Sequence, residues 1–218
     1  MIAPETLWHS LDRFAAERPN KLALSDEQGS ISYAELPAEI QRRAEHLRAV
    51  GCRCVALALP NGREWLLWDL AILKAGLICV PIAPFFTRQQ REHLLRSAGV
   101  DTVLGMADDS AELLAQGFAA TSLGWQRAPM GVGIPAGTAK ITFTSGTTGT
   151  PKGVCLSAEA MLQVADSLRE ACSPVDPQQH LILLPLAVLL DNLGAITALL
   201  NGASISVPTD TGLHGAQI

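Results

Sequence analysis

Segments with helical periodicity alternate with apolar, strand-like segments along most of the 218 residues, and this alternation constrains the fold more than any other feature. Leu7, Leu11 and Phe14 share one face of a helix that should end at Pro19. Strands are expected at 21–25, 54–59, 77–82, 100–104, 140–144, 153–156, 180–184 and 203–207, and further helices at 64–75, 158–171 and 189–201. Because strands separated by helices pack side by side in parallel, the sequence predicts an α/β fold of mainly parallel sheets flanked by helices.

Two patterns predict where further helices begin. Ser32 with Glu35, and Thr87 with Gln90, have the spacing of a capping box. The first should open a helix that runs to about residue 50, and the second a helix that Gly99 ends.

Residues 105–138 show a weaker pattern. The stretch 131–136 superficially resembles a dinucleotide-binding fingerprint, but Pro135 interrupts it and no strand leads into it. A sub-boundary in the domain organisation is expected near residues 128–138.

Charge is unevenly distributed along the chain. Residues 1–130 hold 13 basic and 15 acidic side chains, whereas residues 131–218 hold only 3 and 6. The formal net charge is −5 with no basic block, which argues against a nucleic-acid partner. Nine charged side chains are too few to solvate the surface of an ordinary domain of this size. The second half is therefore expected to be interior or to be covered by further chain.

No targeting or membrane signal is visible in the sequence. The N-terminus lacks a basic region and an apolar core, so no signal peptide is predicted. The longest apolar stretch, 181–200, contains Pro185, Asp191 and Asn192, which excludes a membrane span. The five cysteines fit no zinc spacing and are expected to be buried free thiols. A cytoplasmic protein is predicted.

The segment 144–154, Thr-Ser-Gly-Thr-Thr-Gly-Thr-Pro-Lys-Gly-Val, has the composition of an anion site. Glycines let backbone N–H groups turn toward an anion, and hydroxyls add further donors. Lys152 supplies a compact positive charge. Unlike the Walker loop, this loop lies between two predicted strands and does not open a helix. The chemistry favours a polyphosphate ligand over a flexible linker.

These residues resemble the phosphate-loop signature of the adenylate-forming, or AMP-binding, superfamily. That family includes acyl-CoA synthetases, adenylation domains of non-ribosomal peptide synthetases and luciferases. All defined positions of the signature are filled in 144–154. Residues 31–36 and 73–82 are similar to two earlier elements of the family, in the same order and with agreeing spacing. The resemblance therefore covers essentially the whole chain, as the N-terminal portion of the family fold.

The resemblance implies a two-step ligase reaction with ATP and Mg²⁺. A carboxylate attacks the α-phosphate to give an acyl-adenylate and pyrophosphate, and a thiol, often that of coenzyme A, then takes the acyl group. Thr147 is the implied magnesium ligand. The residues implied to bind the ATP phosphates are Thr144, Ser145, Gly146, Thr147, Thr148, Gly149 and Lys152.

The family's remaining catalytic elements are not found before Ile218. Its Tyr-Gly-x-Thr-Glu element, its ribose-binding aspartate and its late lysine are all missing. We therefore expect residues 1–218 to be the N-terminal part of an adenylation domain, to lack the C-terminal remainder and the catalytic residues, and to be inactive alone.

Residues 183–191 depart from a segment that they otherwise resemble, Leu-Pro-Leu-x-His-x-x-Glu of many acyl-CoA synthetases. Val188 fills the histidine position and Asp191 the acidic one. Valine cannot donate a hydrogen bond to a carboxylate or titrate. Val188, Asp191 and Asn192 are the candidate residues of an acyl-substrate pocket. The apolar stretch 181–200 favours a fatty or other apolar acid.

Two alternatives to a ligase for a fatty or other apolar acid remain. The first is a non-catalytic remnant that binds nucleotide or a partner. The second is an adenylation domain that loads an amino or aryl acid onto a carrier-protein thiol.

Overall fold

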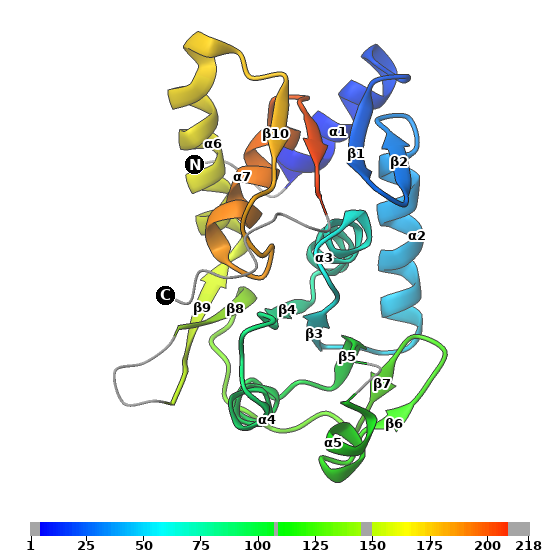
Figure 1. Ribbon diagram of the computed structural model, residues 1–218, viewed down its shortest axis with the longest axis vertical. Helices are drawn as coiled ribbons and strands as arrows, with labels where there is room; N and C mark the ends of the chain where they lie inside the picture. The colour runs from blue at the N-terminus through cyan, green and yellow to red at the C-terminus, as the bar shows by residue number, and fades with distance from the viewer. Residues whose placement is uncertain (1–4, 107–108, 145–149, 209–218) are drawn as a thin grey trace. The chain divides into compact units, whose positions relative to one another are not determined.

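A computed structural model describes residues 5–106, 109–144 and 150–208 (Figure 1). The chain divides into two compact units. The first comprises residues 1–39, 60–66 and 159–218, and the second residues 40–59 and 67–158. The chain therefore crosses between units four times: within α2 (Leu36–Ala49), between Leu59 and Pro60, within α3 (Arg63–Ala75), and just after α6 (Ala158–Cys172) begins. Residues 128–138 lie inside the second unit.

A seven-stranded sheet organises the second unit, in the order β6-β7-β5-β3-β4-β8-β9. Its central strands β5, β3, β4 and β8 are parallel, and β6, β7 and β9 are antiparallel to their neighbours. The strands are β3 (Cys54–Ala58), β4 (Ile78–Pro81), β5 (Thr102–Gly105), β6 (Ala119–Ala120), β7 (Trp125–Gln126), β8 (Thr138–Thr144) and β9 (Lys152–Ser157). The predicted α/β fold is confirmed, as a mixed sheet with a parallel centre.

Helices α3, α4 (Arg88–Ser97) and α5 (Ser110–Ala115) follow the strands of this unit. The capping box predicted at the start of α4 is formed, because Gln90 N–H donates to Thr87 Oγ1 and Thr87 N–H donates to Gln90 Oε1. The one predicted at Ser32 is half formed: the Ser32 amide donates to the Glu35 carboxylate as in a capping box, but the Glu35 amide donates to the Ser32 carbonyl and not to its hydroxyl, and the helix that follows runs to Ala49. There Glu35 accepts from both the Ser32 amide and its hydroxyl, and a turn separates Ser32 from α2.

The first unit contains a four-stranded sheet in the order β10-β11-β1-β2, in which only β2 is antiparallel to its neighbour. The strands are β1 (Leu22–Asp26), β2 (Gly29–Ser32), β10 (Gln179–Leu181) and β11 (Ser204–Ser206). The helices are α1 (Glu5–Glu17), α6, a 3₁₀ turn at Ser173–Val175 and α7 (Leu189–Leu200). α7 contacts α1, β10 and β11, so its apolar residues form much of this unit's core.

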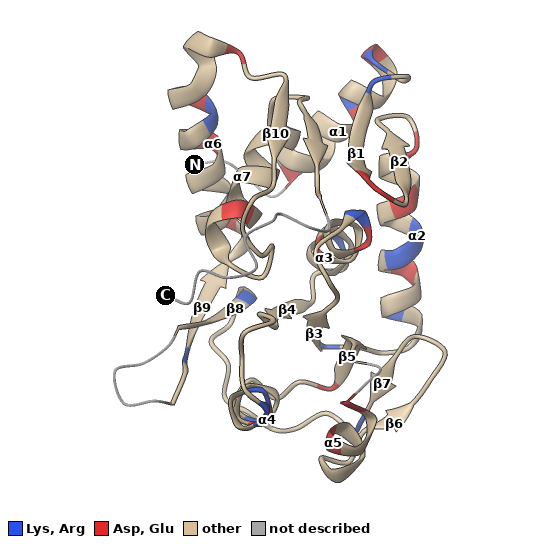
Figure 2. Ribbon diagram, viewed as in Figure 1, with Lys and Arg blue, Asp and Glu red and all other residues tan. Residues whose placement is uncertain are grey.

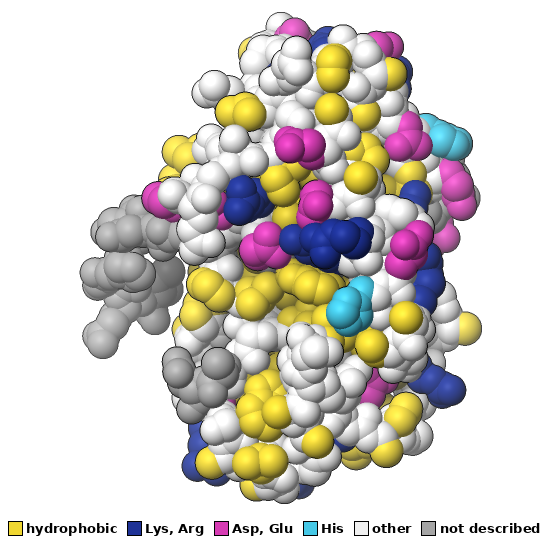
Figure 3. Space-filling view, turned by 90° about the vertical axis from the view of Figure 1, so that its right-hand side faces the viewer, with side chains coloured by type: hydrophobic (Ala, Val, Ile, Leu, Met, Phe, Trp, Pro, Cys, Tyr) yellow, Lys and Arg dark blue, Asp and Glu magenta, His cyan; other side chains and the backbone are white. Residues whose placement is uncertain are grey.

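Charged side chains are sparse on α7 and β10 and frequent on α2 and α4 (Figure 2). On the face drawn in Figure 3, basic and acidic side chains are interspersed and neither sign forms a block. Eight of the thirteen large hydrophobic side chains exposed in the described residues follow residue 130. The charge-poor second half thus carries most of the exposed large hydrophobic side chains.

Three cysteines, Cys52, Cys54 and Cys79, are buried, whereas Cys155 and Cys172 are exposed, so the prediction of burial is wrong for those two. Burial raises the pKa of the Cys54 thiol to about 12. No helix in the described part of the chain is long and apolar enough to span a membrane.

Candidate functional site

The predicted phosphate loop joins the two strands of an antiparallel hairpin, β8 and β9. The two strands lie side by side (Figure 1); Phe143 pairs with Gly153, and Thr144 pairs with Lys152 as the last pair before the loop. The expected strand–loop–strand arrangement is confirmed. Ser145, Gly146, Thr147, Thr148 and Gly149 lie outside the described residues, so of the predicted phosphate ligands the structure locates Thr144 and Lys152, both exposed.

Lys152 differs from the other basic side chains of residues 131–218. Lys140 forms an ion pair with Asp69 at 2.7 Å, and Arg169 forms one with Asp166 at 2.7 Å. The Lys152 side chain has no ion-pair or hydrogen-bond partner in the part of the chain that the structure describes, and the residue is exposed. Its charge is therefore available to an anion at the end of the loop.

A buried ion pair fixes β8 to α3. Lys140 Nζ donates to both carboxylate oxygens of Asp69, at 2.7 and 2.9 Å, and the two side chains are 4% and 5% exposed. Lys140 is also the residue through which β8 pairs with Cys79 of β4. Burial, and next the Asp69 carboxylate, raise the pKa of the Cys79 thiol well above its ordinary value. A charged contact thus anchors the strand that leads into the loop.

A cavity of about 400 Å³ lies along the hairpin, and its wall includes His93 and Ser97 of α4. From the hairpin, Ile141, Phe143, Gly153 and Cys155 line it, and residues 132–135 and 150–152 complete the wall. A Cβ atom on Gly153 would lie 3.1 Å from both Ile141 Cγ2 and Phe143 Cζ. Close packing against these two side chains therefore favours glycine at this position, independently of any role in phosphate binding.

The candidate acyl-pocket residues lie in the first unit, at the start of α7. Val188 is the N-cap residue of α7 and half-buried, and its side chain makes no capping hydrogen bond. The Asp191 carboxylate accepts hydrogen bonds from the amides of Leu183 and Leu184, at 2.9 and 2.5 Å. Asn192 is 2% exposed. Asp191 thus holds the preceding loop, and its two acceptor bonds explain why the predicted strand 180–184 ends at Leu181.

Asn61 makes a long-range contact that its place in a Pro-Asn-Gly turn does not predict. Its amide nitrogen donates to the Leu184 carbonyl at 3.0 Å, and its amide oxygen accepts from Leu186 N–H at 2.8 Å. The segment 183–186 is therefore held from both sides, by Asn61 and by Asp191. The turn carries no signal for this contact in the sequence, because its residues suit an ordinary turn.

His180 on β10 gives the first unit a pH-dependent stability. Burial lowers the pKa of His180, and the Asp191 charge partly opposes that shift. The folded state therefore binds fewer protons than the unfolded state, whose histidine titrates near 6.5. Stability is fully present above that pH and falls as the pH drops below it. We expect His180→Asn to flatten the decline of the urea midpoint between pH 7.5 and 5.5, and His9→Asn, at an exposed position, to leave it unchanged; equal slopes in all three proteins would contradict this.

No three His, Cys, Asp or Glu side chains gather as a metal site among the described residues. Thr147, the predicted magnesium ligand, lies outside them. Magnesium therefore stays a prediction from the resemblance.

Comparison with known proteins places this architecture. The family model for AMP-binding enzymes matches residues 11–217. A probable non-canonical non-ribosomal peptide synthetase, CymA of Salinispora arenicola, is 32% identical over 177 residues, which is 79% of this chain and 2% of CymA. The phosphinothricin tripeptide synthetase PhsC of Streptomyces viridochromogenes is 31% identical over 193 residues, which is 74% of this chain and 17% of PhsC.

Solved structures agree in fold. O-succinylbenzoate coenzyme A synthetase of Bacillus subtilis, solved in complex with AMP, superposes with a TM-score of 0.74 at 23% identity, over 90% of this chain and 54% of its own. This likeness concerns the fold alone, and the chain spans about half of that enzyme and a small part of the peptide synthetases. The family match covers nearly the whole chain, and the chain belongs to the family of AMP-binding enzymes.

Proposed function

We propose that this chain supplies the ATP-phosphate site of an adenylate-forming ligase. In the first step a carboxylate oxygen of the acid attacks the α-phosphorus of ATP, and the bond to the β-phosphate breaks to release pyrophosphate. The resulting acyl-adenylate then loses AMP to a thiol, which becomes a thioester. The observation that carries the proposal is Lys152, exposed and without a described partner at the end of a Ser/Gly/Thr loop.

The hairpin suggests which part of ATP each residue of the loop would contact. Thr144 and Lys152 pair where the two strands end, so the pairing fixes the distance between the two ends of the loop. Residues 144–149 would wrap the β- and γ-phosphates with hydroxyl and amide donors. The Lys152 ammonium would offset the charge of the departing pyrophosphate, which stabilises the transition state electrostatically.

The acid and its acceptor are the finer part of the proposal. The fatty-acid prediction depends on the apolar stretch 181–200, but Leu193, Ile196 and Leu199 of α7 are buried in the core of their own unit. That packing explains the apolar composition without a lipid. The peptide synthetases among the relatives favour the alternative, in which an amino acid is loaded onto a carrier-protein thiol; coenzyme A is the other candidate acceptor.

Equilibrium binding tests this function directly. We expect the 218-residue chain with magnesium to bind ATP and inorganic tripolyphosphate, and to bind AMP more weakly. Calorimetric titration with the three ligands measures the order. Binding of AMP with no binding of tripolyphosphate would contradict a phosphate loop.

Exchange of pyrophosphate into ATP tests the chemistry. We expect no acid-dependent exchange by the chain alone, because the family's catalytic elements are not among its residues. Exchange measured in a longer protein that joins these residues to those elements, with amino acids, aryl acids and fatty acids in parallel, then separates the three acid classes. Exchange with fatty acids only would favour the apolar pocket.

A further inference from the structure

His93 of α4 contacts the residue that immediately precedes Lys152. Its Nε2 atom lies 3.1 Å from the Pro151 carbonyl oxygen. Its ring meets Phe143 of β8 edge-on, with the centroids 6.4 Å apart and the planes at 84°. All of these residues belong to the second unit. We infer that His93 is a positioning residue for Lys152, an inference that rests on the proposed phosphate-binding function.

The chemistry of the contact fixes the direction of the hydrogen bond. A carbonyl oxygen only accepts, so His93 Nε2 must carry the proton and donate it. The neutral ring is therefore the Nε2–H tautomer. Protonation of the ring leaves this donor in place, so the contact does not depend on the charge of His93.

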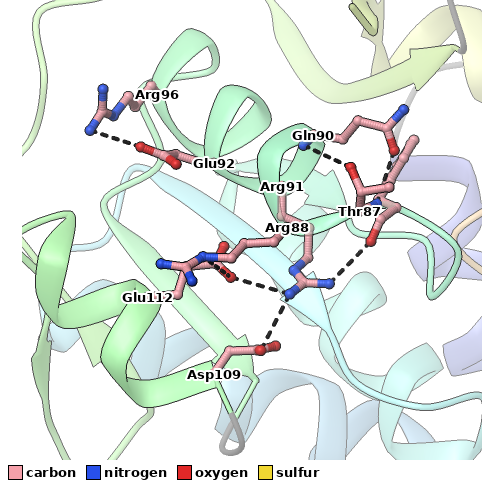
Figure 4. Close-up of polar contacts among 9 residues, drawn as sticks. Thr87, Arg88, Gln90, Arg91, Glu92, Arg96, Asp109 and Glu112 are labelled. Carbon is pink, nitrogen blue, oxygen red and sulfur yellow. Dashed lines mark hydrogen bonds and ion pairs between the residues drawn. The ribbon is translucent and has the colours of Figure 1, made fainter. Parts of the chain in front are cut away.

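The helix that carries His93 is itself held in place. Arg91 Nη2 pairs with Glu112 Oε2 at 3.2 Å and with Asp109 Oδ1 at 3.3 Å, and Arg91 Nη1 donates to the Phe86 carbonyl at 3.1 Å (Figure 4). Figure 4 shows the Arg91 side chain reaching from α4 toward both acidic residues at the start of α5. Glu112 is 5% exposed, so water screens this pair weakly. α4 is thus a fixed support.

The accepting carbonyl belongs to the peptide group that joins Pro151 to Lys152. Pro151 is buried, and its ring fixes its own φ angle. On the other side of Lys152, Gly153 packs against Ile141 and Phe143. The lysine side chain is a flexible stem of four carbons with rotatable bonds between them. Its ammonium group therefore reaches a phosphate reproducibly only where the backbone is fixed. The hydrogen bond from His93, which lies outside the hairpin, is one of the contacts that fix this backbone.

Two substitutions separate the donor from the ring. His93→Phe keeps a ring that can pack against Phe143 but removes the donor, whereas His93→Gln keeps an amide donor of similar reach without the ring. We expect His93→Phe to weaken tripolyphosphate binding about fivefold, the effect of one hydrogen bond, and His93→Gln to stay within about twofold of wild type. Ser97→Ala, one turn along the same helix, is the control and should leave the affinity unchanged.

A double-mutant cycle with Lys152→Ala distinguishes positioning from general weakening. If His93 acts through Lys152, His93→Phe should have no further effect once the ammonium is gone. Equal losses in both backgrounds, or wild-type affinity in His93→Phe, would overturn the inference and leave the proposed function standing. If wild type itself binds no tripolyphosphate, the proposed function fails first and the positioning role with it.

Nitrogen NMR of the imidazole gives a readout independent of phosphate. We expect the neutral ring of His93 in wild type to be the Nε2–H tautomer. The Nδ1–H tautomer would overturn the inference, since the Pro151 carbonyl would then receive no donor.

Discussion

Lys152→Ala should weaken tripolyphosphate binding about 10- to 100-fold and AMP binding much less. A hydrogen bond to a charged group contributes about 1.5–3 kcal/mol, and the terminal phosphates that Lys152 would meet are absent from AMP. The side chain is exposed and has no partner among the described residues, so its removal should not lower the thermal midpoint. Titration calorimetry with ATP, tripolyphosphate and AMP measures the three losses on one protein.

Two further variants sharpen this test. Lys152→Arg keeps the charge but replaces the compact ammonium by a planar fork, and we expect an intermediate affinity. Lys21→Ala removes the same charge from the residue before β1 in the first unit, where Lys21 Nζ donates to Gln178, and should change no affinity. Equal losses of tripolyphosphate and AMP in Lys152→Ala would contradict the assigned role, because they would indicate a general change in net charge.

The parts of the fold that the sequence predicted are those with strong local signals. The buried strand β3 and the Thr87 capping box have all their information in adjacent residues. Helix α5 and the short strands β6 and β7 were missed, because two-residue strands and a six-residue helix show no measurable periodicity. The Ser32 capping box is only half formed, because Ser32 ends strand β2 and the next residue, Tyr33, is fully buried and donates its hydroxyl to the Ala203 carbonyl.

In the candidate site, too, the features with a local sequence signal were predicted and those set by tertiary contacts were not. The loop between two strands was predictable, because its glycines and hydroxyls stand between apolar runs. Its supports were not, since His93 lies 58 residues from Pro151 and Asp69 lies 71 residues from Lys140. A histidine among charges on a helix is typical of a solvated side chain. Only the fold that brings α4 beside the hairpin gives that histidine a carbonyl to bind.

The buried pair of Asp69 and Lys140 should have the largest effect on stability. Lys140→Met leaves the Asp69 carboxylate buried without its ammonium partner, which costs about 3–5 kcal/mol. Asp69→Leu combined with Lys140→Met replaces the pair by apolar groups and should recover most of that loss. Urea unfolding of the wild type, the single variant and the double variant measures the three free energies. Arg169→Ala, at a partly exposed pair, is the control and should cost under about 1 kcal/mol.

The same variants test whether stability and phosphate binding are linked through β8. Lys140 is the residue of β8 that pairs with β4, so loss of its ammonium should loosen the strand that leads into the loop. We expect Lys140→Met to weaken tripolyphosphate binding and the double variant to restore it, because the apolar pair again anchors β8 on α3. If the double variant regains stability but not affinity, phosphate binding needs the Asp69–Lys140 ion pair itself at this position and not merely a stable anchor. Recovery of both would show that β8 needs an anchor at this position, whatever its charge.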